Sequence, residues 1–148
     1  MEMVLTLAII SIVSAAVLPK FVDSSGLEEY AYRAESISVL RAVQQKALQT
    51  GLCHRILITD KVLGEFDRGS CDVAPVPAST SSWLNNINEN TSVFITQDSV
   101  SYQVAATGQA IAFDDLGRPV CVCNTDIVIQ GVDSLTIRIE AQGYIHAL

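Results

Sequence analysis

The chain opens with an uninterrupted apolar stretch. Residues 3–18 read MVLTLAIISIVSAAVL, without a charged side chain. As a helix this stretch would be about 24 Å long, slightly less than a hydrocarbon core of about 30 Å. Glu2 precedes it where a signal peptide carries basic residues, and Pro19-Lys20-Phe21 follows where small residues would mark a cleavage site. We therefore predict a retained membrane anchor, with a cleaved signal peptide as the alternative.

Apolar side chains then recur at spacings of three and four. The apolar positions are Leu27, Tyr30, Ala31, Ala34, Ile37, Leu40, Val43, Ala47 and Leu48, and the opposite face carries Glu28, Glu29, Arg33, Glu35, Arg41, Gln45 and Lys46. This periodicity predicts an amphipathic helix that ends near Thr50 and lays one apolar stripe on a sheet. Gly51 is placed to cap its C-terminus. We expect a kink or loosening between Pro19 and Gly26.

From Cys53 onward the period of the pattern changes to two. The predicted strands are residues 54–59, 92–96, 99–104, 109–113, 120–123, 127–129 and 135–139. Turn residues separate them, so hairpins and a mostly antiparallel, meandering sheet are expected. Residues 74–82 are typical of a loop, and residues 83–87 are compatible with a helical turn after it.

These elements predict an α+β fold in a single modest domain, since the chain has 148 residues. Residues 1–25 are the predicted transmembrane and assembly segment. Residues 26–148 are the predicted head, in which the amphipathic helix of residues 27–50 lies on a sheet spanning residues 54–147.

The net negative charge of the chain argues against nucleic acid as a partner. The chain has 9 Lys and Arg against 16 Asp and Glu, for a formal net charge of −7, and its basic residues are scattered singly. Such a balance disfavours a surface that follows nucleic-acid phosphates.

Four cysteines lie beyond the apolar stretch: Cys53, Cys71, Cys121 and Cys123. An even number outside the cytoplasm favours disulfides. Free buried thiols and a four-thiolate zinc site remain alternatives, although the zinc site lacks the usual pair of Cys-x-x-Cys motifs. Cys53 with Cys71 would close a short, hairpin-sized loop and is the favoured pair. A bridge between Cys121 and Cys123 would be awkward in a regular strand.

The ends of the apolar stretch carry two motifs. Residues 1–7, MEMVLTL, match the pattern F-T-L-x-E-x-V from its fourth position, and Pro19-Lys20-Phe21 closes the stretch. In these features the chain resembles the type IV pilin superfamily, whose mature subunits begin with that pattern. The leader, its cleavage-site glycine and the first three residues of the pattern would precede Met1, so we expect the true start to lie upstream.

Two further motifs resemble minor members of the superfamily. Phe113, Gly117, Arg118 and Pro119 are similar to the F-x-x-x-G-R-P turn of the H-type minor pseudopilins of type II secretion. Residues 143–146 are similar to the closing strand of MSHA-type minor pilins. The resemblance implies a structural minor pilin of an MSHA-like type IV pilus that aids initiation or adhesion. The alternative is an H-type minor pseudopilin.

The resemblance also implies an assembly interface on the N-terminal helix. Its expected residues are Glu2, Met3, Val4, Leu5, Leu7, Ile10 and Pro19. The partner of the Glu2 carboxylate would be the α-amino group of a neighbouring subunit; alternatively, Glu2 is solvated at the headgroups of a simple anchor. The implied partners are other major and minor pilin subunits, and the inner membrane before assembly. The head would lie in the periplasm until the subunit enters a pilus or pseudopilus.

Candidate catalytic groups are few. His54 and His146 lie near no nucleophile motif and are expected to be strand-edge residues. We expect no catalytic residue, cofactor or small-molecule substrate. A DNA-capturing competence pilin and a membrane-anchored periplasmic enzyme are the alternatives from other classes.

Two pairs of neighbouring carboxylates have structural explanations. Glu28 and Glu29 are assigned to the solvated helix face, and Asp114 and Asp115 to a turn in which an Asp caps backbone N–H groups. Calcium at the second pair is the alternative, without a recognisable calcium loop. Arg118 is expected to leave this turn, or to contact a neighbouring subunit.

Overall fold

A computed structural model of the chain describes residues 3, 4, 6, 7, 10, 27–72, 93–95, 100–103, 109–120 and 125–148. The predictions for Glu2, Leu5, Pro19, Cys121, Cys123, the loop of residues 74–82 and the turn of residues 83–87 lie outside these residues.

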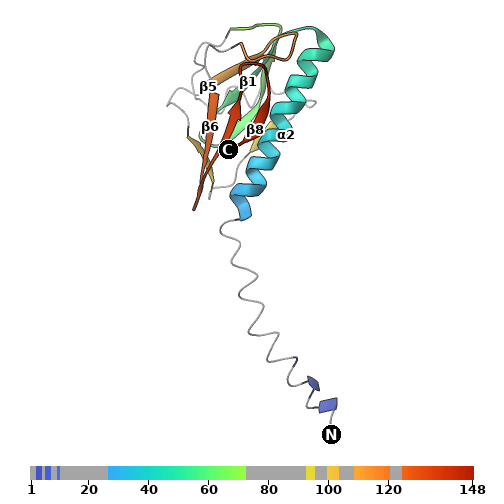
Figure 1. Ribbon diagram of the computed structural model, residues 1–148, viewed down its shortest axis with the longest axis vertical. Coiled ribbons are helices and arrows are strands. Elements are labelled where there is room, and N and C mark those ends of the chain that lie inside the picture. Colours follow the sequence, from blue (N-terminus) through green and yellow to red (C-terminus); the bar gives the residue numbers. More distant parts are fainter. Residues whose placement is uncertain are drawn as a thin grey trace.

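Helix α2 (Leu27–Thr50) has the predicted bounds and runs along one side of the head (Figure 1). It ends because Gly51 adopts a φ of 64°, which glycine reaches without steric cost. The N–H of Gly51 donates to the carbonyl oxygen of Ala47 at 3.0 Å. The predicted glycine cap is confirmed.

The predicted apolar stripe of α2 is right at Leu40, Val43 and Ala47 in the second half, and wrong at Leu48 and through most of the first half. The buried residues are Glu29, Tyr32, Ser36, Leu40, Val43 and Ala47. Of the predicted stripe, Leu27, Tyr30, Ala31, Ala34 and Leu48 are exposed.

Buried polar groups explain why the first half of α2 buries a different face from the predicted one. The Ser36 hydroxyl lies 2.6 Å from the hydroxyl of Tyr102, and Glu29 accepts backbone hydrogen bonds from a turn. Buried polar groups are tolerated when such partners are present. The assignment of Glu29 to the solvated face is therefore wrong.

In the part of the chain that the structure describes, the strands form two four-stranded sheets instead of the single predicted one. The first has the order β3-β2-β1-β5, the second β4-β6-β7-β8, and all pairs are antiparallel. The strands are β1 (His54–Ile58), β2 (Val62–Arg68), β3 (Val93–Ile95), β4 (Ser101–Gln103), β5 (Gln109–Phe113), β6 (Thr125–Gln130), β7 (Ser134–Ile139) and β8 (Ile145–Ala147).

Two strand predictions need correction. Strand β2 was not predicted, because Gly64 and Glu65 interrupt its apolar pattern. Glu65 faces Ile56 across the sheet and is buried in spite of its charge. Val120, predicted to start a strand, lies outside any strand, although its N–H donates to the carbonyl oxygen of Ala112 at 2.8 Å.

One hydrophobic core joins α2 to both sheets. Its buried members are Tyr32, Leu40, Val43, Ala47, Ile56, Ile58, Leu63, Val100, Tyr102, Ile111, Phe113, Ile127, Ile129, Ile137, Ile139 and Ile145. In β6 and β7, buried residues alternate with more exposed ones, so one face of the second sheet is in the core. The α+β prediction of a helix packed on antiparallel strands is confirmed.

A single glutamine ties the helix to two turns, one from each sheet. The Nε2 of Gln44 donates to the carbonyl oxygens of Gly117 and Gly143, both at 2.7 Å. The two turns touch here, because a Cβ added to Gly143 would collide with the carbonyl oxygen of Gly117. Gly143 also has a φ of 91°, so this position suits glycine for two reasons.

We predict that Gln44→Ala lowers the free energy of unfolding by about 1–3 kcal/mol, because both part-buried carbonyl groups lose their donor. The measurement is urea unfolding of the detergent-solubilised protein, followed by near-UV circular dichroism. Gln45→Ala, on the exposed side of the same helix, is the matched control and should change stability by less than about 0.5 kcal/mol. Equal losses in the two variants would contradict the role of Gln44.

Candidate assembly surface and its supports

The described residues of the N-terminal stretch present apolar side chains to solvent. Met3, Val4, Leu7 and Ile10 are helical and between 61% and 83% exposed. Apolar surface of this extent is unfavourable in water at about 25 cal/mol per Å² and typically marks contact with protein or lipid. None of the helices in the described part of the chain has both the length and the hydropathy that a membrane crossing needs.

The outward face of α2 changes character along its length. In its first turns this face carries Leu27 (69% exposed), Tyr30 (50% exposed), and the exposed Ala31 and Ala34. Farther along, the exposed residues are mostly polar and include Ser38, Arg41, Gln45 and Gln49, with Leu48 (52% exposed) as the apolar exception. We call Leu27, Tyr30, Ala31 and Ala34 the lower face of α2. Two alanines beside two large side chains allow close approach of another helix.

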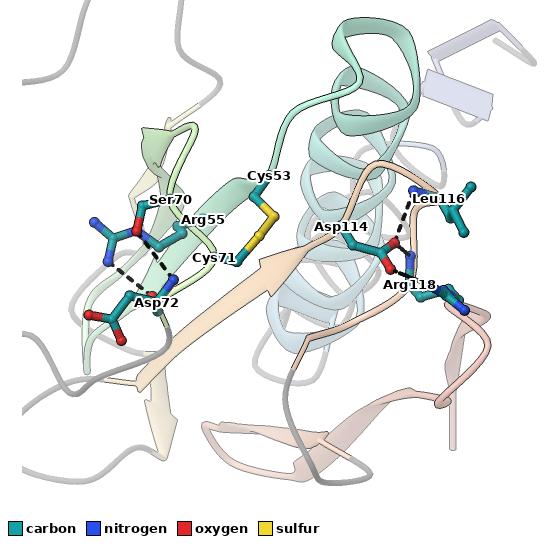
Figure 2. Close-up of a disulfide and its surroundings, with 8 residues drawn as sticks. All are labelled: Cys53, Arg55, Ser70, Cys71, Asp72, Asp114, Leu116 and Arg118. Carbon is teal, nitrogen blue, oxygen red and sulfur yellow. Dashed lines mark hydrogen bonds and ion pairs between the residues drawn. A yellow bond between two sulfur atoms is a disulfide. The ribbon is translucent and has the colours of Figure 1, made fainter.

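A disulfide lies just beyond the C-terminal end of α2. Cys53, just before β1, is bonded to Cys71, which follows β2 (Figure 2). The favoured pairing is therefore confirmed. The bridge holds the segment after β2, where the carbonyl oxygen of Asp72 accepts a hydrogen bond from Arg55 Nη1 at 3.0 Å.

Beside this disulfide lies a buried polar cluster. The Nδ1 of His54 is 2.6 Å from Glu65 Oε1, and Lys46 Nζ donates to Glu65 Oε2 at 2.8 Å. His54 Nε2 lies 2.8 Å from Thr50 Oγ1. The line of hydroxyl, imidazole and carboxylate resembles a nucleophile triad, but the Thr50 hydroxyl donates to the carbonyl oxygen of Lys46 at 2.8 Å. The cluster ties α2 to β1 and β2.

The expectation that His54 is a strand-edge residue is wrong. It starts β1, an inner strand of the first sheet, and is 2% exposed. His146 fits the expectation, since β8 is the edge of the second sheet as described; its ring stacks on Tyr144 and its Nε2 lies 3.2 Å from Glu140 Oε1.

Opposing effects set the pKa of Glu65. Burial raises it, but the hydrogen bonds and positive charge of Lys46 and His54 outweigh burial, so the pKa of Glu65 is lowered. The ionised carboxylate therefore contributes stability well above pH 4.3, roughly the unfolded-state value. This contribution is lost as the pH falls through the lowered value of the folded state.

The F-x-x-x-G-R-P motif forms a compact turn (Figure 2). Asp114 Oδ1 accepts the N–H of Leu116 at 3.0 Å and that of Arg118 at 2.7 Å, and Oδ2 accepts Arg118 Nε at 3.0 Å. Burial raises the pKa of Asp114, but these bonds outweigh it and lower the pKa. The predicted Asp cap is confirmed. Phe113 is fully buried and bridges to Pro119, which accounts for both ends of the motif.

Three supporting residues were missed from the sequence: Glu29, Gln44 and Glu65. Glu29 was assigned to the solvated face, and Gln44 and Glu65 were given no role. Each is held by groups from other elements of the fold. A signal did exist for Glu29, which follows the period of Tyr32, Ser36, Leu40 and Val43. The apolar residues beside Glu29 follow a second helical period, and the prediction followed that one instead.

Comparison with solved structures identifies the architecture. The chain is similar to the type IV minor pilin FimU of Pseudomonas aeruginosa strain PAO1, with a TM-score of 0.60 and 12% sequence identity, over 84% of this chain and 91% of that chain. The chain has a pilin-like fold. No protein-family model and no curated protein sequence matches it.

In this pilin-like fold the disulfide is expected to stabilise the end of β2. Cys53→Ala combined with Cys71→Ala should lower the free energy of unfolding by about 2–4 kcal/mol, because the reduced chain gains conformational freedom when unfolded. Urea unfolding of the detergent-solubilised variant measures this. Wild-type protein under reducing conditions is the matched comparison, and it should show a similar loss. A variant as stable as the oxidised wild type would contradict this prediction.

A second prediction concerns pH. Glu65→Gln should lower stability at pH 7, and should also reduce the further loss between pH 7 and pH 3, since its titrating group is gone. Chemical unfolding at pH 7, 5 and 3 measures both effects. Glu35→Gln, on the exposed side of α2, should keep the wild-type pH dependence. A wild-type slope in Glu65→Gln would show that Glu65 is not linked to acid unfolding.

Proposed function

We propose that this chain is a minor pilin subunit of an MSHA-like type IV pilus, where it aids initiation or adhesion. The observation that carries the proposal is the outward, apolar lower face of α2. It follows an apolar N-terminal stretch in the same chain, on a pilin-like head. A chain acting alone gains nothing from either surface in water.

The two apolar surfaces are suited to each other. The N-terminal stretch of one subunit packs against the lower face of α2 in the next, and both lose contact with water or lipid. Such a contact joins different surfaces of the two subunits, so it leaves one of each free at the ends. Contacts of this kind build open filaments when the rotation between subunits does not close a ring.

Glu2 gives the contact between subunits a specific polar pairing. A charged carboxylate at the edge of an apolar helix costs free energy in lipid when it has no partner. The α-amino group of a neighbouring subunit provides that partner in the assembled filament. Glu2, Leu5 and Pro19 belong to the proposed interface together with Met3, Val4, Leu7 and Ile10.

The subunit is proposed to occupy two locations in turn, one before and one after assembly. Before assembly the N-terminal helix is anchored once in the inner membrane, with the head in the periplasm. After assembly the subunit lies in a pilus among major and minor pilins. Its net charge of −7 argues against DNA as a partner.

An H-type minor pseudopilin of type II secretion is the second candidate. It is favoured by the turn of residues 113–119. The same turn packs against Gln44 and Leu48 of α2, so its residues also have a structural explanation. The fibre to which the subunit belongs distinguishes the two candidates: sheared surface pili for a pilin, and secretion without surface pili for a pseudopilin.

Ala34→Glu should block assembly by placing a charge on the lower face of α2, while the protein stays folded and membrane-bound. The measurement is the amount of subunit in sheared filaments relative to the membrane fraction. At least a tenfold loss is expected, because weakening the contact between subunits by about 1.4 kcal/mol lowers its association constant tenfold. Gln45→Glu is the matched control. It adds the same charge to the polar half of the exposed face, about three turns away, and should assemble normally.

Normal amounts of the Ala34→Glu subunit in filaments would refute the proposed contact. Glu2→Ala tests the other half of the interface: it should remain in the membrane and be absent from filaments.

A further inference from the structure

Glu29 is a carboxylate buried in the first turn of α2. It is 1% exposed, and its Oε1 accepts the N–H of Val132 at 2.5 Å and that of Asp133 at 3.4 Å. Both donors belong to the turn of residues 131–133 that joins β6 to β7. The contact therefore joins two segments about a hundred residues apart in the chain.

The turn is shaped to receive this carboxylate. A Cβ added to Gly131 would collide with Glu29 Oε1, so the glycine leaves room for the side chain. The N–H of Gly131 donates to the carbonyl oxygen of Asp133 at 3.1 Å, which closes the turn and directs the next two N–H groups to Glu29. Successive backbone N–H groups arranged in this way form a nest for an anion.

The second carboxylate oxygen is in a different situation. Glu29 Oε2 is buried and has no hydrogen-bond partner among the described residues. Unpaired buried acceptors cost free energy, so the carboxylate is held here by donors to one oxygen alone.

The charged groups around Glu29 offer it no cation in the described contacts. On α2 its neighbours are Glu28 and Arg33. Arg33 donates to the carbonyl oxygen of Leu148 and lies over the ring of Tyr30. On the turn the nearest charge is the exposed Asp133. The attachment thus relies on N–H dipoles, which bind a carboxylate more strongly than a neutral carboxyl group.

We propose that Glu29 is a proton-sensitive latch: when ionised it holds the β6–β7 turn against α2, and when protonated it releases the turn. Release removes the charge-assisted bonds to Val132 and Asp133. It also frees the tip of the hairpin, where the Val132 side chain is already 74% exposed. The latch sets how the first turn of α2 is rotated, because burying Glu29 turns Leu27 and Tyr30 outward.

The electrostatics agree in direction with this geometry. The N–H of Glu29 itself lowers the pKa of its carboxyl group, burial opposes this, and the N–H groups of Val132 and Asp133 lower it further; the net pKa is lowered. The sign follows: the latch is fully engaged above about pH 4.3, the ordinary glutamate value. It opens as the pH falls through the lower pKa of the folded state.

The test is an NMR titration of the ¹⁵N-labelled 148-residue chain in detergent micelles, from pH 7 to pH 2.5. The amide protons of Val132 and Asp133 should move upfield together as their hydrogen bonds are lost, with a midpoint below 4.3, the approximate value of a free glutamate. The amide of Ile56 in β1 is the reference for global unfolding. Movement of Val132 only in step with Ile56 would overturn the proposal.

Variants separate Glu29 from the neighbouring carboxylates. Glu29→Gln should abolish the titration step at Val132. Glu28→Gln, the matched control in the same turn, should keep it. A step that persists in Glu29→Gln would overturn the latch. Should Glu29→Gln fail to fold, the ¹³C resonance of the Glu29 carboxyl group in wild-type protein gives the same test: its midpoint must coincide with that of Val132, and a different midpoint overturns the proposal.

Discussion

The side-chain amide of Gln44 joins α2 by directed bonds to one turn of each sheet. Its two donated hydrogen bonds reach the turn after β5 and the turn between β7 and β8, each at 2.7 Å. The hydrophobic core brings α2 and the sheets together, but apolar contacts have little directionality. The amide fixes how far the helix lies from each turn. It also fixes the separation of the turns, since both carbonyls must reach one nitrogen.

The same principle operates at three other positions along α2. Glu29 meets the β6–β7 turn, Ser36 meets Tyr102, and Lys46 meets Glu65. These polar contacts are spaced along the inner side of the helix from its first turn to its last. Each would be costly to break in a buried site, so together they allow one rotation of α2 about its axis.

That rotation connects the fold to the proposed function. With polar anchors inside, the first turns of α2 expose Leu27, Tyr30, Ala31 and Ala34, which a helix acting only as a packing element would bury. The arrangement places apolar surface where another subunit's helix can reach it. In the proposed function, the stability of the head and the capacity to assemble depend on the same few hydrogen bonds, and a latch at Glu29 would link both to protonation.

Local patterns in the sequence were sufficient for much of the fold. The period of three to four residues and Gly51 predicted the bounds of α2, because helix propensity and capping act within a few residues. Alternation predicted β1, β5 and the centres of β6 and β7. The Cys53–Cys71 pair and the Asp114 cap also came from short spacings, where the chain itself keeps the partners close. The resemblance to pilins came from motifs in the N-terminal stretch and one turn.

Only the tertiary structure decided the rotation of α2, the division into two sheets, the two contacts of Gln44, and the burial of Glu29, His54 and Glu65. Glu29 and Gln44 depend on partners about a hundred residues away in the chain, Val132 and Gly143. Glu65 depends on β2, a strand that the sequence pattern did not predict and that places it opposite Ile56. Sequence patterns predict that a polar residue is exposed, because hydropathy reflects only the free-energy cost of burying its polar group. The hydrogen bond that offsets this cost becomes visible only when the partner is known. The sequence by itself determined the bounds of α2 and most of the antiparallel strands of the head, and it predicted an apolar N-terminal helix leading into them. Which side of that helix remains free for a neighbour followed from long-range hydrogen bonds, which no local pattern records.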